Sequence, residues 1–122
     1  MKKVFVSFDY DNDKALREFI VGQSKLPDSP FKISDWSMKE AALERDWEAK
    51  AKFRISRVDL VIVMVGHSTY SASGVLKEVG FANDFNVPIY QVIGYKDGNY
   101  TRVPNAGVLY KWNWENLKKI FS

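Results

Sequence analysis

Short apolar segments alternate along the chain with longer segments in which apolar residues recur every three or four positions. The short segments are rich in β-branched and aromatic residues, which favours strands. We predict strands at residues 4–8, 31–34, 58–66, 87–93 and 108–110. The longer segments have the spacing of amphipathic helices, and one of them predicts a helix over residues 40–56. The other helical stripes are formed by Leu16, Phe19 and Ile20, by Val75, Val79 and Ala82, and by Leu117 and Ile120 behind a capping Asn113.

The uninterrupted apolar run from Leu60 to Val65 indicates how these elements are arranged. A continuous run is typical of a strand that is covered on both faces, as in the middle of a parallel sheet. Strands that alternate with helices predict an α/β domain with right-handed crossovers. We therefore predict one doubly wound, flavodoxin-like domain over residues 1–122. Its parallel sheet should have five strands in the order 2-1-3-4-5, with the Leu60–Val65 strand in the centre.

Composition agrees with one globular domain and argues against several classes of partner. Hydrophobic residues make up 46% of the 122 residues, which is enough for a core. The net charge is +3, and the basic residues are interleaved with acidic ones along the chain. A nucleic-acid-binding surface usually concentrates its basic residues in a stripe, so we expect no nucleic-acid partner.

The chain has no cysteine and one histidine, His67. This excludes a disulfide scaffold, a thiol nucleophile, a zinc–cysteine site and a histidine-rich metal site. The apolar stretch near the N-terminus is too short for a signal peptide, and no apolar run is long enough to span a bilayer. We expect a cytoplasmic protein without a bound metal and without a membrane partner.

We look for candidate reactive and binding residues where doubly wound sheets bind ligands, which is beyond the carboxyl ends of the strands. This rule selects residues 7–11, 35–38 and 66–73. The third of these loops is rich in hydroxyl groups and leads into a helix, whose first N–H groups suit an anion.

Glu78 is the candidate reactive group on that helix, about two turns from its start. It falls at the edge of the stripe that Val75, Val79 and Ala82 define. We expect its carboxylate to be half-buried, to face the loops and to have a pKa raised by burial. An ordinary surface glutamate on an amphipathic helix is the competing interpretation, and the pattern alone favours it.

Other reactive residues have simpler explanations. No carboxylate partner can be identified for His67, so a loop histidine is favoured over a general base. A triad of Ser68, His67 and Asp59 is disfavoured because Asp59 falls at the opposite end of its strand. The aspartates within residues 9–13 fit the cap of a helix better than a magnesium pocket.

The residues of several strands and loops resemble one family. Val4-Phe5-Val6-Ser7-Phe8 is similar to the opening strand of TIR domains. The segment from Ile62 to Ser71, followed by Glu78-Val79, resembles the third strand and helix of TIR-like proteins of the Thoeris anti-phage systems. Asp35-Trp36-Ser37 after the second strand matches the same branch. The resemblance covers nearly the whole chain, and it rests on the order and spacing of these motifs together.

The resemblance implies an enzyme that hydrolyses or cyclises NAD, which is its substrate rather than a cofactor. Glu78 corresponds to the catalytic glutamate that engages the ribose next to nicotinamide. The product would be a nucleotide signal that reaches an effector by diffusion, and TIR–TIR or homo-oligomeric assembly is expected. The residues expected around the substrate are Ser7, Phe8, Asp35, Trp36, His67, Thr69 and Ser71.

One departure from the family and a second resemblance leave two alternatives open. Many TIR enzymes have a tryptophan four residues before the catalytic glutamate, where this chain has Gly74. Trp36 or Tyr70 could supply the missing aromatic wall. The chain could instead be a non-catalytic TIR scaffold that assembles with other TIR domains. The segment from Ser73 to Ala82 also resembles the nucleophile helix of nucleoside deoxyribosyltransferases, in which the glutamate attacks a sugar.

Overall fold

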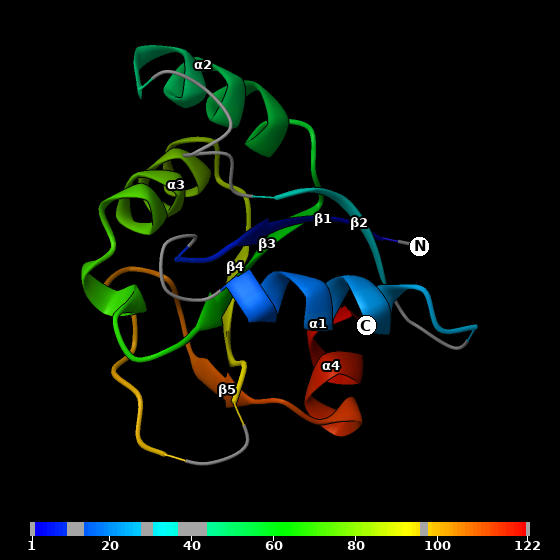
Figure 1. The fold of residues 1–122 in the computed structure, drawn as a ribbon. Coiled ribbons are helices and arrows are strands. Elements are labelled where there is room, and N and C mark those ends of the chain that lie inside the picture. The colour runs from blue at the N-terminus through cyan, green and yellow to red at the C-terminus, as the bar shows by residue number, and fades with distance from the viewer. Residues whose placement is uncertain (1, 10–13, 28–30, 37–43, 96–97, 122) are drawn as a thin grey trace.

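The computed structural model describes residues 2–9, 14–27, 31–36, 44–95 and 98–121. They form a parallel sheet flanked by helices on both faces, which confirms the α/β class (Figure 1). The sheet has the strand order β2-β1-β3-β4-β5. The strands are β1 (Lys2–Ser7), β2 (Phe31–Trp36), β3 (Leu60–Val65), β4 (Ile89–Ile93) and β5 (Leu109–Lys111). The helices are α1 (Lys14–Ser24), α2 (Glu44–Ile55), α3 (Ser73–Asp84) and α4 (Trp114–Phe121), with a 3-10 turn, η1, at Thr69–Ser71.

The parallel register brings the carboxyl ends of neighbouring strands to one edge of the sheet. Ser7 of β1 lies beside Val63 of β3, and Val65 lies beside Ile93 of β4. On the other side of β1, Val6 pairs with Trp36 at the end of β2. Loops that leave these strands therefore begin next to one another, which is where a doubly wound sheet binds ligands.

The core has two layers because both faces of the sheet are covered (Figure 1). Every residue of β3 is buried, as its uninterrupted apolar run predicts. Alternate β3 residues point to opposite faces. One face packs against α1 and α4 through Leu16, Ile20, Leu117 and Ile120. The other packs against α2 and α3 through Ile55, Val75, Val79 and Ala82.

Several element boundaries differ from the prediction. The second strand continues through Asp35 and Trp36, because their backbones pair with Phe5 and Val6 of β1. The first helix continues to Ser24, although the sequence predicts a loop that begins at Gly22. The described part of the helix predicted at 40–56 begins at Glu44, and residues 40–43 lie outside the described residues. Within the described segments, no helix has both the length and the apolar character needed to cross a membrane.

Candidate functional site

Glu78 lies under the carboxyl edge of the sheet and contacts the end of β1. The Ser7 hydroxyl donates a hydrogen bond of 2.8 Å to Glu78 Oε1. Both residues are buried, with exposed fractions of 0% for Ser7 and 1% for Glu78. Ser7 can reach Glu78 because strand alternation places its side chain on the α3 face of the sheet.

The prediction that Glu78 would be half-buried is wrong, because α2 covers the flank of α3. The two helices pack side by side, and Lys77 of α3 forms an ion pair of 2.6 Å with Glu48 of α2. A residue at the edge of the apolar stripe of α3 is therefore enclosed by the sheet on one side and by α2 on the other. Burying a carboxylate is costly in free energy, and such groups are concentrated at functional sites.

The loop between β3 and α3 is held by its own polar side chains. The backbone N–H of Gly66 donates a hydrogen bond of 2.7 Å to Thr69 Oγ1, and Thr69 is fully buried. Ser71, which is exposed, donates from its hydroxyl to the Ser68 carbonyl at 3.2 Å. The hydroxyl-rich sequence of this loop thus produces a tight turn directly before α3, the helix that carries Glu78.

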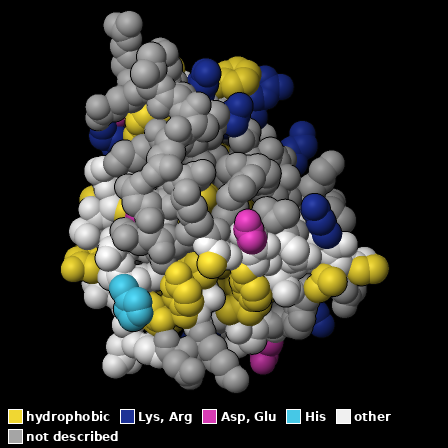
Figure 2. Space-filling view, in the orientation of Figure 1, with side chains coloured by type: hydrophobic (Ala, Val, Ile, Leu, Met, Phe, Trp, Pro, Cys, Tyr) yellow, Lys and Arg dark blue, Asp and Glu magenta, His cyan; other side chains and the backbone are white. Residues whose placement is uncertain are grey.

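His67 is exposed and takes part in a cluster of aromatic rings. Its ring centroid lies 4.7 Å from that of Tyr100 and 6.3 Å from that of Tyr95. The two tyrosine rings stack 5.9 Å apart with an interplanar angle of 18°. Figure 2 shows the histidine at the molecular surface beside hydrophobic side chains. This aromatic cluster joins the β3–α3 loop to the segment that follows β4, a contact that no local sequence pattern indicates.

Phe8, Asp35 and Trp36 are the remaining residues that were predicted around the substrate. Phe8 is buried in the core on the α1 and α4 face, across the sheet from the Ser7 side chain. Asp35 and Trp36 end β2, and their backbones pair with β1 at the same sheet edge. Their side chains lie outside what the structure describes. Asp9, which was explained by helix capping, is buried just beyond Ser7. The structure thus brings Ser7 directly to Glu78 and places the Thr69 loop at the start of α3.

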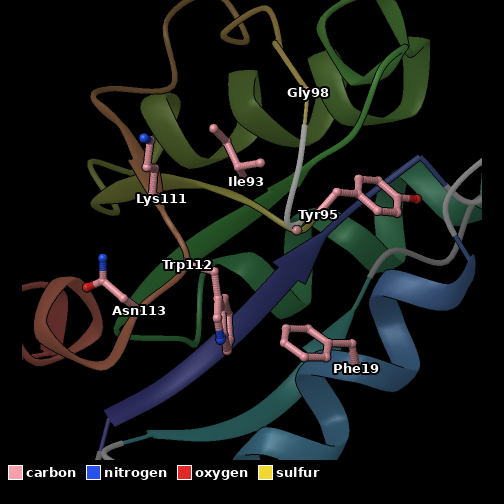
Figure 3. A pocket seen from close by; sticks show the side chains of 8 residues that line it. Phe19, Ile93, Tyr95, Gly98, Lys111, Trp112 and Asn113 are labelled. Atoms are coloured by element: carbon pink, nitrogen blue, oxygen red, sulfur yellow. The ribbon is translucent and has the colours of Figure 1, made fainter.

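A cavity of about 480 Å³ lies over the carboxyl ends of β4 and β5 (Figure 3). Phe19 of α1 and Trp112 provide aromatic walls, Lys111 and Asn113 provide polar groups, and Tyr95 also lines the cavity. The sequence analysis missed this cavity. Its only local signal in the sequence is the dipeptide Gly94-Tyr95 at the end of a strand. Many loops begin with such a dipeptide.

Among the residues that the structure describes, no three histidine, aspartate or glutamate side chains gather as a metal site would require. Comparison of the sequence with protein-family models and with curated proteins finds no match.

Proposed function

We propose that this chain is a TIR-like domain that cleaves the bond between nicotinamide and ribose in NAD, with Glu78 as the catalytic residue. The observation that carries the proposal is the burial of the Glu78 carboxylate at the carboxyl edge of the sheet, where Ser7 orients it. The motif resemblance of β1, β2 and the β3–α3 segment to TIR domains supplies the substrate.

The chemistry requires one well-placed negative charge. Nicotinamide departs as a neutral group, so no acid is needed to protonate it. The electron pair of the breaking bond leaves with nicotinamide, and the ribose becomes an oxocarbenium-like cation that a carboxylate stabilises. Attack of water on this cation, with loss of its proton, gives ADP-ribose. Attack by another atom of the same molecule gives a cyclic isomer, and either product would act as a diffusible signal to an effector in anti-phage defence.

Ser7 and the β3–α3 loop are positioning residues in this proposal. The hydrogen bond from Ser7 fixes one carboxylate oxygen, so the charge is oriented before substrate binds. The bond between Gly66 and Thr69 fixes the turn that precedes α3. Gly74 is buried in the first turn of α3, so an aromatic wall for the base must come from another position, such as Trp36 or Tyr70.

The test is incubation of the purified chain with NAD and chromatography of the products. Glu78→Gln keeps the shape of the side chain and an acceptor for Ser7 but removes the charge. We expect nicotinamide release to fall by about 10²–10³-fold or more. Glu115→Gln, at an exposed position in the first turn of α4, is the matched control and should keep full activity. Undiminished nicotinamide release by a folded Glu78→Gln variant would rule out the catalytic role.

The same experiment separates the alternatives when a nucleoside panel is included. Consumption of deoxynucleosides but not NAD would indicate a nucleoside deoxyribosyltransferase, in which Glu78 attacks the sugar. Absence of turnover with every substrate, together with self-association of the chain, would favour a TIR scaffold.

A further inference from the structure

The cavity over β4 and β5 is separate from the Glu78 site. Its lining residues come from α1, from the segment after β4 and from the end of β5. None of the cavity's described lining residues belongs to β1, to the β3–α3 loop or to α3. We infer that this cavity is a second ligand site, which binds a nucleoside monophosphate by its flat base and its phosphate.

The aromatic side chains supply surfaces for a flat ring. Phe19 and Trp112 meet edge to face, with ring centroids 4.9 Å apart and an interplanar angle of 62°. Phe19 is 38% exposed although it lies on an amphipathic helix, so its ring is open to a ligand. Figure 3 shows the Phe19 and Trp112 rings lying together, while the ring of Tyr95 points away from Trp112. Aromatic pairs of this kind favour planar heterocyclic ligands.

The positive charge of one lining residue favours an anionic ligand. Lys111 is the charged side chain among the described lining residues, and it is exposed at the end of β5. Asn113 lines the cavity beside it, and its Oδ1 is held by the backbone N–H of Asn116 at 2.7 Å. In Figure 3, Lys111 and Asn113 lie on the same side of the cavity. One ammonium and one oriented amide suit a single phosphate group.

The size of the cavity also fits a ligand larger than one ring. A volume of about 480 Å³ falls within the roughly 300–1,000 Å³ typical of small-molecule sites. Gly94 also lines the cavity, and its backbone N–H bonds to the Val65 carbonyl at 3.1 Å. A side chain at Gly94 would collide with Leu16 of the core, so this part of the lining is backbone alone.

The test uses adenosine 5′-monophosphate (AMP) as the probe, with titration calorimetry and nitrogen–proton NMR spectra. We expect AMP to bind, adenosine to bind about tenfold more weakly because it lacks the phosphate, and ribose 5-phosphate to bind weakest because it lacks the base. The chain has four tryptophans, and Trp112→Phe identifies the indole N–H signal of Trp112. That signal should shift when AMP is added.

Two variants locate the site. Lys111→Gln should weaken AMP binding about tenfold, to the affinity of adenosine. Lys118→Gln, on an exposed part of α4 outside the cavity, should leave binding unchanged. The indole signal of Trp112 should shift with AMP whether or not the chain releases nicotinamide from NAD, which distinguishes this inference from the catalytic proposal. Absence of AMP binding at millimolar concentration, full affinity in Lys111→Gln, or weakened AMP binding in Lys118→Gln would each overturn the inference.

Discussion

Ser7 and Glu78 are 71 positions apart in the chain, yet a buried hydrogen bond of 2.8 Å joins them. The bond ties the end of β1, next to the centre of the sheet, to the second turn of α3. It explains why a serine follows the apolar residues Val4, Phe5 and Val6 of β1: a larger apolar side chain at position 7 would occupy the space of the carboxylate and offer it no donor.

The first prediction concerns Ser7→Ala. Removing a donor from a buried carboxylate should lower the free energy of unfolding by about 1–3 kcal/mol, measured by urea denaturation. Ser56→Ala is a matched control, because the Ser56 hydroxyl bonds to the Phe53 carbonyl at an exposed position, and it should cost less. Equal stability of Ser7→Ala and the wild type would show that the Ser7 bond contributes nothing.

The second prediction concerns the turn before α3. Thr69→Val keeps the shape of the side chain but removes the acceptor of the buried Gly66 N–H. We expect a loss of about 1–3 kcal/mol in the free energy of unfolding and faster amide exchange at Gly66. Thr69→Ser keeps the oxygen and should preserve slow exchange. If Thr69→Val left Gly66 equally protected, the hydroxyl would not be what holds this turn.

The sequence predicted features that depend on local pattern. The apolar run of Leu60–Val65 placed β3 in the middle of a parallel sheet. A strand that is covered on both faces has no solvent-facing positions, so apolar and polar residues do not alternate along it. Asn113 was expected to cap the last helix, and its Oδ1 accepts the N–H of Asn116 at the start of α4. Glu78 was placed on a helix by the spacing of Val75, Val79 and Ala82, and it lies in α3.

Features that depend on the packing of distant elements could not be predicted. The full burial of Glu78 requires α2 to lie beside α3, and helical periodicity does not indicate which neighbour a helix has. The contact of His67 with Tyr95 and Tyr100 depends on the path of a loop without regular structure. The cavity beside Trp112 arises where α1 and the ends of β4 and β5 meet, and no single segment encodes that space.

The third prediction concerns Gln91, a buried polar residue in β4. Its Nε2 donates to the carbonyls of Val103 and Gly107 at 3.0 and 2.8 Å, and its Oε1 accepts the N–H of Val103 at 2.6 Å. Gln91→Leu should lower the free energy of unfolding by about 3–5 kcal/mol, because the buried N–H and carbonyl of Val103 lose their partner together. It should also displace Tyr100 from the aromatic cluster, which NMR shifts of the His67 ring would report.

Gln91→Glu separates hydrogen bonding from packing. The carboxylate keeps the acceptor for Val103 N–H but brings an oxygen against two carbonyls, so it should be at least as destabilising as leucine. A stable Gln91→Glu protein with an unchanged His67 spectrum would contradict the role of the amide as the anchor of this segment.

The fourth prediction is a pH dependence at the α2–α3 contact. The hydrogen bond from Lys77 holds the pKa of Glu48 below its ordinary value, and the charges of Lys77 and Lys52 act in the same direction. A carboxylate whose pKa is lowered by folding stabilises the folded state above its unfolded pKa, and this contribution is lost as the pH falls through the folded pKa. The wild type should therefore be more stable than Glu48→Gln at neutral pH, and the two should converge in acid. Added salt should shrink the difference at neutral pH, because the pair is exposed. A difference that persisted in acid would point to packing rather than charge.

The last prediction compares two glycines of opposite character. Gly22 lies in α1 with open space where a Cβ would stand, so Gly22→Ala should raise the free energy of unfolding by about 0.5–1 kcal/mol. Gly107 has a φ of +82°, and a Cβ there would lie 2.9 Å from the Ile89 carbonyl oxygen. Gly107→Ala should lower the free energy of unfolding by about 2 kcal/mol or more, because the backbone angle and the contact both oppose a side chain.

The Gly107 carbonyl also accepts the bond from Gln91, so the loss should be smaller when Gly107→Ala is made in a Gln91→Leu background. Strictly additive losses in that double mutant would show that the two residues do not hold the segment together.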